Sequence, residues 1–272
     1  MPQLPRRKTI LMCPPDHFGV AYVINPWMEG QYARTDAEEA RVQWFGLKKL
    51  VEAQADVRLL DPHPDLPDLV FTANAGLPRG DKVVLSRFRC PERRGEEAIF
   101  RSFFTAHGFE IIDPPPSLFF EGAGDALYDG ARDLYWVGHG FRSHRDAAPF
   151  LEKTLGARTL SLALIDPRFY HLDTCLCPLP GGFLLYFPGA FDAPSRAAIE
   201  AHVAPEQRIE ADSAEAESFC CNAVAVNDRV LLNAASPRLR QKIASAGFQV
   251  ESTPLTQFMK AGGAAKCLTL EL

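Results

Sequence analysis

The chain has 272 residues, of which 47% are hydrophobic and 23% are charged, and its formal net charge is -5 at pH 7. This length and composition allow a sizeable core in one or two domains. No block of basic residues is present, which argues against nucleic-acid binding. No apolar stretch approaches the ~18 residues of a membrane-spanning helix, and the N-terminus lacks the apolar region of a secretory signal. We therefore expect a cytoplasmic protein with no membrane partner.

The seven cysteines do not form the pattern of a disulfide framework or a zinc site. Their number is odd, so they cannot all pair within one chain. Neither Cys175 with Cys177 nor Cys220 with Cys221 has the Cys-x2-Cys spacing typical of zinc ligands. In a strand, residues 175 and 177 point to the same face, so we expect both in the core.

The first strongly periodic segment is 37–51, where apolar residues recur at spacings of three and four. These residues are Ala37, Ala40, Trp44, Leu47 and Val51. Thr35 and Glu38 are predicted to form a capping box before them. The sequence therefore predicts an amphipathic helix whose apolar face packs on the core.

Four β-hairpins are predicted next, from apolar runs that flank turns rich in Gly, Asn or Asp. In chain order the paired runs cover 69–73 with 82–86, 125–128 with 134–137, 172–176 with 183–187, and 222–226 with 230–233. A fifth is predicted where 267–270 meets the rest of the chain. Helices are predicted between the hairpins, over 99–106 and beginning near Ala148, Ser195 and Pro237. Recurrence at roughly 50-residue intervals indicates a closed radial α/β architecture of repeated ββαβ units.

Four polar residues in turn-rich contexts supply the parts of a cysteine hydrolase. Cys267 follows a small-residue stretch near the end of the chain, and His171 lies in Phe-Tyr-His-Leu-Asp-Thr. Glu121 begins Glu-Gly-Ala-Gly-Asp, and Asn74 lies in Phe-Thr-Ala-Asn-Ala-Gly. These residues fall near hairpin starts, which a radial fold gathers at one mouth.

Together with Asn25 in Asn-Pro-Trp-Met, these motifs resemble the guanidino-group-modifying superfamily of arginine deiminases, dimethylarginine dimethylaminohydrolases and amidinotransferases. The resemblance runs from about residue 8 to the C-terminus and is closest to the arginine dihydrolase branch. It implies a five-bladed α/β propeller (the pentein fold) and a single catalytic domain over residues 1–272, in agreement with the hairpin pattern.

The resemblance also assigns roles to particular side chains. It makes Cys267 the nucleophile and His171 the general acid/base, while Glu121 and Asp173 grip the guanidinium. Asn25 and Asn74 would line the reacting end. Arg93 and Arg142 would clamp the substrate carboxylate, with Arg94 as the alternative to Arg93; the planar guanidinium matches a carboxylate in bidentate geometry. Thiolate chemistry on a guanidinium needs neither a metal nor an organic cofactor.

The expected reaction is hydrolysis of L-arginine through a covalent amidino-thioester, continuing through citrulline to L-ornithine, ammonia and carbon dioxide. Asn74 favours this outcome, because relatives tend to carry a carboxylate there. An amide offers a donor as well as an acceptor and can hold both a guanidinium and a neutral ureido group.

Three alternatives stay open at this point. The first is a single-step arginine deiminase or dimethylarginine dimethylaminohydrolase that stops at citrulline. The second, an amidinotransferase, is disfavoured by chain length, and the third, a non-catalytic binding propeller, by the catalytic set. The expected partner is a small-molecule substrate, and assembly into a homo-oligomer is left open.

Overall fold

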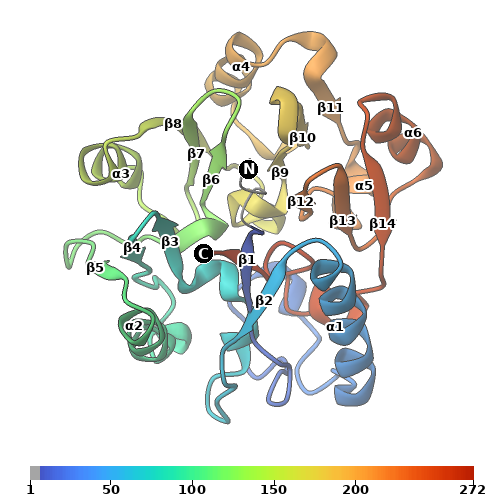
Figure 1. The fold of residues 1–272 in the computed structure, drawn as a ribbon. Helices are drawn as coiled ribbons and strands as arrows, with labels where there is room; N and C mark the ends of the chain where they lie inside the picture. The colour runs from blue at the N-terminus through green and yellow to red at the C-terminus, as the bar shows by residue number, and fades with distance from the viewer. Residues whose placement is uncertain (1–6) are drawn as a thin grey trace, which may run out of the picture.

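The structure is a computed structural model that describes residues 7–272. It is an α/β fold of five three-stranded sheets, and the sheets are arranged around a common centre (Figure 1). The radial arrangement predicted from the recurring hairpins is therefore present. Within the described residues, no helix has both the length and the apolar character needed to cross a membrane.

All five sheets share one pattern, in which the middle strand pairs antiparallel with an inner strand and parallel with an outer strand. The inner strands, nearest the centre in Figure 1, are β3 (Gly76–Arg79), β6 (Ala126–Asp129), β9 (Leu176–Pro178), β12 (Val224–Val226) and β15 (Leu270–Glu271). The middle strands are β4 (Lys82–Leu85), β7 (Leu134–His139), β10 (Leu184–Tyr186), β13 (Arg229–Leu232) and β1 (Thr9–Met12). The outer strands are β5 (Glu110–Ile112), β8 (Arg158–Ala163), β11 (Arg208–Glu210), β14 (Gln249–Ser252) and β2 (Asp56–Leu59).

The two ends of the chain close the ring by sharing one sheet. β15 pairs antiparallel with β1, with Ile10 opposite Glu271 and Leu11 opposite Leu270. β1 in turn pairs parallel with β2. Four sheets are thus built from consecutive chain, whereas the fifth depends on a pairing between the first and last strands.

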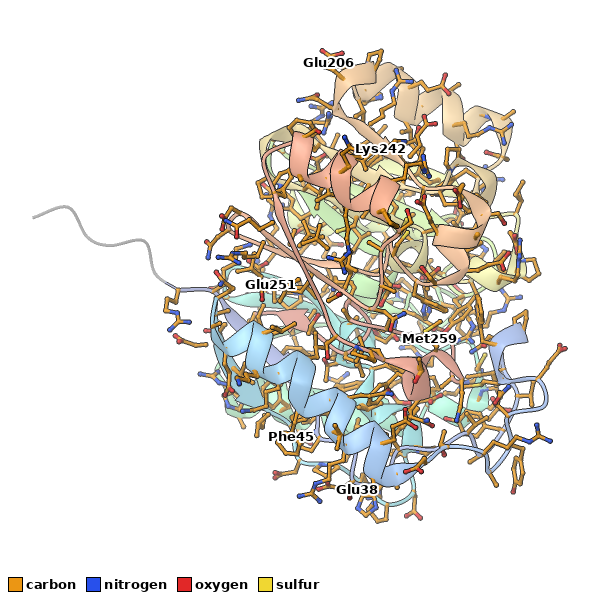
Figure 2. The ribbon with its side chains drawn as sticks, turned by 90° about the vertical axis from the view of Figure 1, so that its right-hand side faces the viewer. Glu38, Phe45, Glu206, Lys242, Glu251 and Met259 are labelled. Atoms are coloured by element: carbon orange, nitrogen blue, oxygen red, sulfur yellow. The ribbon has the colours of Figure 1, made fainter. Side chains whose placement is uncertain are left out.

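Helices on the periphery connect each middle strand to its outer strand (Figure 1). They are α1 (Ala37–Glu52), α2 (Glu96–Ala106), α3 (Ala147–Leu155), α4 (Ala193–His202) and α6 (Pro237–Ser245). Two short helices, α5 (Ser213–Glu217) and α7 (Thr256–Met259), lie between sheets in the sequence. In α1 the predicted apolar positions Ala40, Trp44, Leu47 and Val51 are buried, while Glu38 and Phe45 lie on its outer side (Figure 2).

The inner strands begin later than the apolar runs predict. Residues Pro67–Val70 and Thr72–Ala75 are 3-10 helices, and β3 starts only at Gly76. Likewise Leu172–Thr174 is a 3-10 helix before β9. Both segments were predicted as strands because a buried turn and a buried strand contain the same kind of apolar run. These turns direct polar side chains toward the centre of the ring of sheets, which a regular flat β-strand would not do.

The cap of α1 also differs from the prediction. Asp36, not Thr35, is the N-cap, and its Oδ1 accepts the backbone N–H of Glu39 at 2.9 Å. The predicted capping box of Thr35 and Glu38 does not form. The N–H of Asp36 donates to Oε1 of Gln257 at 3.0 Å, and the Glu39 carboxylate accepts from Gln43 and Gln257.

Asp36→Ala is expected to lower the free energy of unfolding by about 1 kcal/mol, the usual cost of losing an N-cap side chain. Thr35→Ala, the matched control, should change it by only a few tenths of a kcal/mol, roughly the effect of a neutral surface substitution. Urea unfolding followed by circular dichroism measures both. A larger loss of unfolding free energy in Thr35→Ala than in Asp36→Ala would instead support the predicted cap at Thr35.

Candidate active site

Five polar side chains that precede the five inner strands meet at one end of those strands. They are Asn74 before β3, Glu121 before β6, His171 before β9, Asn222 before β12 and Cys267 before β15. All five residues are between 0% and 3% exposed. Since the inner strands surround one centre, the loops before them converge, and each sheet contributes one group.

Cys267 is held between an amide and a carboxylate. Nδ2 of Asn222 donates to its Sγ at 3.1 Å, and the two carboxylate oxygens of Asp173 lie 3.5 and 3.7 Å from the same sulfur. Burial, followed by the negative charge of Asp173, raises the pKa of the Cys267 thiol well above its ordinary value, although Asn222 and Lys266 act in the opposite direction. This direction favours the neutral thiol over the thiolate.

His171 forms a charge-stabilised pair with Glu121. Its Nε2 lies 2.7 Å from Oε2 of Glu121, which also accepts from Nη1 of Arg142 at 3.2 Å. Burial alone would raise the pKa of Glu121, but Arg142 and His171 outweigh it and hold the pKa below its usual range. Glu121 is thus ionised and orients the imidazole, which is what a general acid/base requires. The guanidinium of Arg142 stacks over the ring of Tyr170 at 4.6 Å.

The amide of Asn74 has a fixed orientation. Its Nδ2 donates to the backbone oxygen of Glu121 at 2.9 Å, and its Oδ1 accepts from Nη1 of Arg93 at 2.9 Å. Only Nδ2 therefore keeps a free N–H. Gly124 makes room for it, because a Cβ at Gly124 would lie 2.4 Å from that nitrogen.

Arg93 is engaged more fully than its expected role implies. Its Nε and Nη2 pair with the two carboxylate oxygens of Glu96 at 2.8 and 2.7 Å, and Nη2 also donates to the backbone oxygen of Asp68. With the bond to Asn74, one of its five N–H groups is left without a partner among the described residues. Arg142 keeps more, because only Nη1 and Nη2 donate, to Glu121 and to the oxygen of Ile24. Arg94, the alternative, is directed to the backbone oxygens of Phe88 and Arg89.

Asn25 serves local structure. Its Oδ1 caps the 3-10 helix Pro26–Met28, and its Nδ2 donates to the oxygen of Ala261 at 3.0 Å. It lies beside the turn that leads to Cys267, since a Cβ at Gly262 would come within 2.9 Å of its Oδ1. The expectation that Asn25 lines the reacting end stays a prediction.

Asn222 is the residue that the sequence analysis missed. Besides its bond to the sulfur, its Nδ2 donates to the backbone oxygen of Asp173 at 2.9 Å, and its Oδ1 accepts the backbone N–H groups of Ala264 and Cys267 at 3.0 and 3.2 Å. One amide thus fixes the Cys267 loop and the Asp173 backbone together. Its position at the start of the fourth hairpin, equivalent to that of Asn74, was the only available signal.

The cluster contains more buried acidic than basic side chains. The buried acids around it are Asp68, Glu96, Glu121, Asp125 and Asp173, and the buried arginines are Arg93 and Arg142. Burial raises the pKa of every one of these acids except Glu121, so they are not all fully ionised. The carboxylate of Asp125 accepts from Ser143 Oγ and the N–H of Leu172, whereas the carboxylate of Asp173 accepts only from the thiol among the described residues. A cationic group bound at Asp173 would therefore meet a favourable potential.

The buried side chains of the site are closed to solvent. Segment 22–28 is tied to the cluster through Nη2 of Arg142, which donates to the oxygen of Ile24 at 2.8 Å. Nε1 of Trp27 donates to the oxygen of Arg168 at 2.7 Å. A cavity lined by residues of the five inner strands lies elsewhere, and Cys267, His171 and Glu121 do not line it.

No group of three or more His, Cys, Asp or Glu side chains within residues 7–272 is arranged to hold a metal ion. All seven cysteines are free, and Cys175 and Cys177 lie in the core as predicted. The chemistry that the cluster offers is that of a thiol, an imidazole and carboxylates.

Comparisons with known proteins agree with this site. The sequence model of the family described as "N,N dimethylarginine dimethylhydrolase, eukaryotic" matches residues 30–272. The bifunctional arginine dihydrolase/ornithine cyclodeaminase ArgZ of Synechocystis sp. is 54% identical over 263 residues, which cover 97% of this chain and 37% of ArgZ. The N(G),N(G)-dimethylarginine dimethylaminohydrolase of Mycobacterium tuberculosis is 38% identical over 269 residues, covering 98% of this chain and 87% of that enzyme.

A solved structure is equally similar. The N-terminal domain of ArgZ, crystallised with its substrate, matches with a TM-score of 0.96 and 53% identity over 97% of both chains. The chain therefore belongs to the dimethylarginine dimethylaminohydrolase family, within the guanidino-group-modifying superfamily. The resemblance predicted from the motifs is confirmed. The chain nevertheless spans little more than a third of the length of ArgZ, 37%.

Asp173→Asn is expected to stabilise the protein at pH 8 but not at pH 4. Burial raises the pKa of Asp173 to about 6 from its ordinary 3.8, against the opposing effects of His171 and Lys266. An acid whose folded-state pKa is raised costs nothing below its unfolded-state pKa, and the cost is complete above the folded-state pKa. The shift corresponds to about 3 kcal/mol, or roughly 5 °C in Tm for a chain of this size.

Thermal unfolding followed by circular dichroism at both pH values measures this difference. Asp81→Asn, at an exposed turn, is the control and should leave Tm unchanged at each pH. A gain in Tm for Asp173→Asn that is equal at pH 4 and pH 8 would contradict the assignment of an ionised, buried carboxylate.

Proposed function

We propose that this protein hydrolyses L-arginine, using Cys267 as nucleophile, and carries the reaction through citrulline to L-ornithine, ammonia and carbon dioxide. The observation that carries the proposal is the placement of the Cys267 thiol against the Asp173 carboxylate, in a buried, acid-rich cluster that also contains the His171–Glu121 pair. Its 54% identity to ArgZ, a bifunctional enzyme with arginine dihydrolase activity, supports the substrate class.

In the first half-reaction the substrate activates its own nucleophile. A guanidinium held by Asp173 places positive charge beside the sulfur and offsets the burial that keeps the thiol neutral. The thiol proton passes to His171, the sulfur attacks the guanidinium carbon, and His171 returns the proton to the departing ammonia. A covalent amidino-thioester results. A structure of the N-terminal domain of ArgZ covalently bound to a reaction intermediate supports this route.

Water completes each cycle. His171 takes a proton from water, the hydroxide adds to the amidino carbon, and the carbon–sulfur bond breaks to give citrulline and the restored thiol. In the second cycle the sulfur attacks the ureido carbon of citrulline and releases the second ammonia. Hydrolysis of the resulting thiocarbamate gives a carbamate, which loses carbon dioxide to leave ornithine. Arginine and two waters thus balance with ornithine, two ammonia molecules and carbon dioxide.

Asn74 supplies the reason to favour two cycles. Its Nδ2 uses one N–H on the backbone oxygen of Glu121 and its Oδ1 accepts one bond from Arg93, so the amide retains both a donor and an acceptor. The donor can pair with a ureido oxygen. Glu121 already accepts from His171 and Arg142, so Asp173 is the primary guanidinium ligand and Glu121 the second.

Arg142 is proposed as the principal clamp for the substrate carboxylate, because it retains N–H groups that Arg93 has committed to Glu96. Arg93 assists with its remaining N–H. Asn25 is proposed to shape the reacting end through the turn at 261–262.

The five sheets are proposed to form a five-bladed propeller with pseudo-fivefold symmetry, and residues 1–272 to act as one catalytic domain. The family match and the 38% identity to a dimethylarginine dimethylaminohydrolase favour one alternative function. That alternative is a single hydrolysis that yields citrulline from arginine or from a methylated arginine.

Cys267→Ser is expected to lower kcat for arginine by at least about 10³-fold, because a hydroxyl does not supply the anion that attacks. Cys90→Ser is the matched control and should retain turnover, because Cys90 is half-buried and its thiol forms no hydrogen bond in the described residues. Ammonia release from the purified variants measures both. Substantial turnover by Cys267→Ser would remove the nucleophile assignment.

Asn74→Asp is expected to make citrulline accumulate. The carboxylate still pairs with a guanidinium, so the first hydrolysis persists, but it presents no donor to the ureido oxygen and leaves that oxygen facing negative charge. The ratio of citrulline to ornithine over time, in wild type and variant, is the measurement. Wild type that stops at citrulline would establish the single-step alternative, and ornithine formation by Asn74→Asp at the wild-type rate would remove Asn74 as the discriminating residue.

A further inference from the structure

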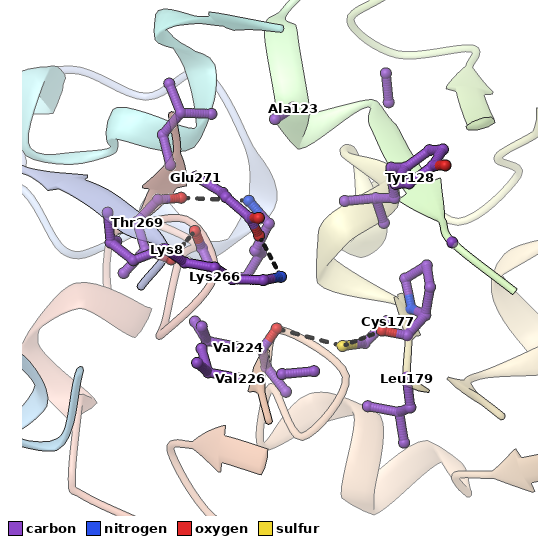
Figure 3. A pocket seen from close by; sticks show the side chains of 18 of the residues that line it. Lys8, Ala123, Tyr128, Cys177, Leu179, Val224, Val226, Lys266, Thr269 and Glu271 are labelled. Carbon is purple, nitrogen blue, oxygen red and sulfur yellow. Dashed lines mark hydrogen bonds and ion pairs between the residues drawn. The ribbon is translucent and has the colours of Figure 1, made fainter. Parts of the chain in front are cut away.

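A cavity of about 860 Å³ lies between the inner strands of the five sheets (Figure 3), and Cys267, His171 and Glu121 do not line it. Its walls are inner strands and hairpin turns from different sheets, including Pro78, Tyr128, Leu179 and Val226. Those turns mark the ends of the inner strands opposite to the ends that carry Cys267. The volume is within the range of small-molecule pockets, about 300–1,000 Å³.

One side of the cavity carries the charge. Lys8, Lys266, Thr269 and Glu271 lie together there (Figure 3). Nζ of Lys8 pairs with Oε2 of Glu271 at 2.9 Å. Nζ of Lys266 donates to the backbone oxygen of Thr269 at 3.2 Å and has no carboxylate within 4.0 Å in the described part of the chain. An ammonium has three N–H groups, so Lys266 retains donors and an unneutralised charge.

The other side is apolar. Tyr128, Cys177 and Leu179 lie across the cavity from the charged group (Figure 3). Leu127 and Val226 add further apolar surface. A cavity with one uncompensated cation and an opposing apolar wall is complementary to a molecule that has an anionic group at one end and an apolar body at the other.

We propose that this cavity is a second binding site, for an amphipathic organic anion. Its carboxylate, sulfonate or phosphate would pair with Lys266, and its aromatic or aliphatic body would pack on Leu127, Tyr128 and Leu179. A cationic ligand such as the proposed substrate is disfavoured, because the uncompensated charge of the cavity is positive. The site goes beyond the proposed function and does not depend on it.

An anion bound to Lys266 is also expected to affect the Cys267 thiol. Lys266 immediately precedes Cys267, and its charge lowers the pKa of both Cys267 and Asp173 against the larger effect of burial. An anion that neutralises Lys266 removes this contribution and leaves the thiol harder to ionise. Occupancy of the cavity is therefore expected to lower kcat for arginine.

The probe for the test is 8-anilinonaphthalene-1-sulfonate, an anion with an aromatic body whose fluorescence rises in apolar surroundings. It is titrated into the full chain carrying Cys267→Ser, with and without saturating L-arginine, so that no turnover occurs. We expect one saturable site per chain that arginine does not displace. Lys266→Met, which removes the charge and keeps a long side chain, should weaken binding at least about 10-fold.

Ala131→Trp provides an independent test. Ala131 is exposed and lines the mouth of the cavity, so a large ring there fills the entrance without disturbing the core. It should also weaken binding about 10-fold. Lys242→Met, which removes a lysine on α6 at the outer surface (Figure 2), is the matched control and should bind like the parent. Circular dichroism and Tm establish that each variant is folded.

Unchanged affinity in both Lys266→Met and Ala131→Trp would overturn the proposal, as would displacement of the probe by arginine or equal weakening in Lys242→Met. Failure of the proposed arginine chemistry would appear as absent ammonia release in the wild-type chain and would leave this binding measurement intact.

Discussion

The pairing of β15 with β1 is the contact on which the remainder of the molecule depends. It joins the first and last strands, with Leu11 opposite Leu270, and so completes the fifth sheet. Cys267 lies three residues before β15 and reaches the cluster only because that strand is fixed in the ring. The backbone oxygen of Cys267 also accepts the N–H of Ala73 at 3.1 Å, which ties the last loop to the loop that precedes the first hairpin.

Within the cluster, burial and charge oppose each other in a way that suits a cationic substrate. Removing acidic groups from water is costly unless they are paired, and here five buried acids face two arginines. Within residues 7–272, the carboxylate of Asp173 has no cationic partner in hydrogen-bond contact and accepts only from the thiol. A guanidinium bound there would offset the cost of burying this carboxylate, and the same positive charge would favour the thiolate of Cys267.

Two features of the structure share the inner strands. The buried polar cluster lies where these strands begin, and the central cavity extends along them to the turns at their other ends. Lys266 lines the cavity and is followed directly by Cys267 in the cluster. A change of charge at Lys266 is therefore expected to shift the pKa of the Cys267 thiol. Asn222 fixes this segment, since its backbone oxygen accepts the N–H of Lys266 at 3.2 Å and its side chain binds the sulfur.

The sequence alone predicted the repeated hairpins and the helices between them, because turn chemistry and hydrophobic period depend on residues that are close together in the chain. Local motifs also led to the hypothesis that Cys267, His171 and Glu121 form one reactive set, and their roles stay a prediction. The sequence did not determine where the inner strands begin, since a buried 3-10 turn and a buried strand have the same apolar run.

Only the tertiary structure decided that Asn222 holds the sulfur and that Arg93 is committed to Glu96 and Asn74. These contacts depend on which side chains come close together once the five sheets are arranged around one centre. Asn222 and Cys267 are 45 residues apart in the chain, and no local pattern records which side chains meet across that separation.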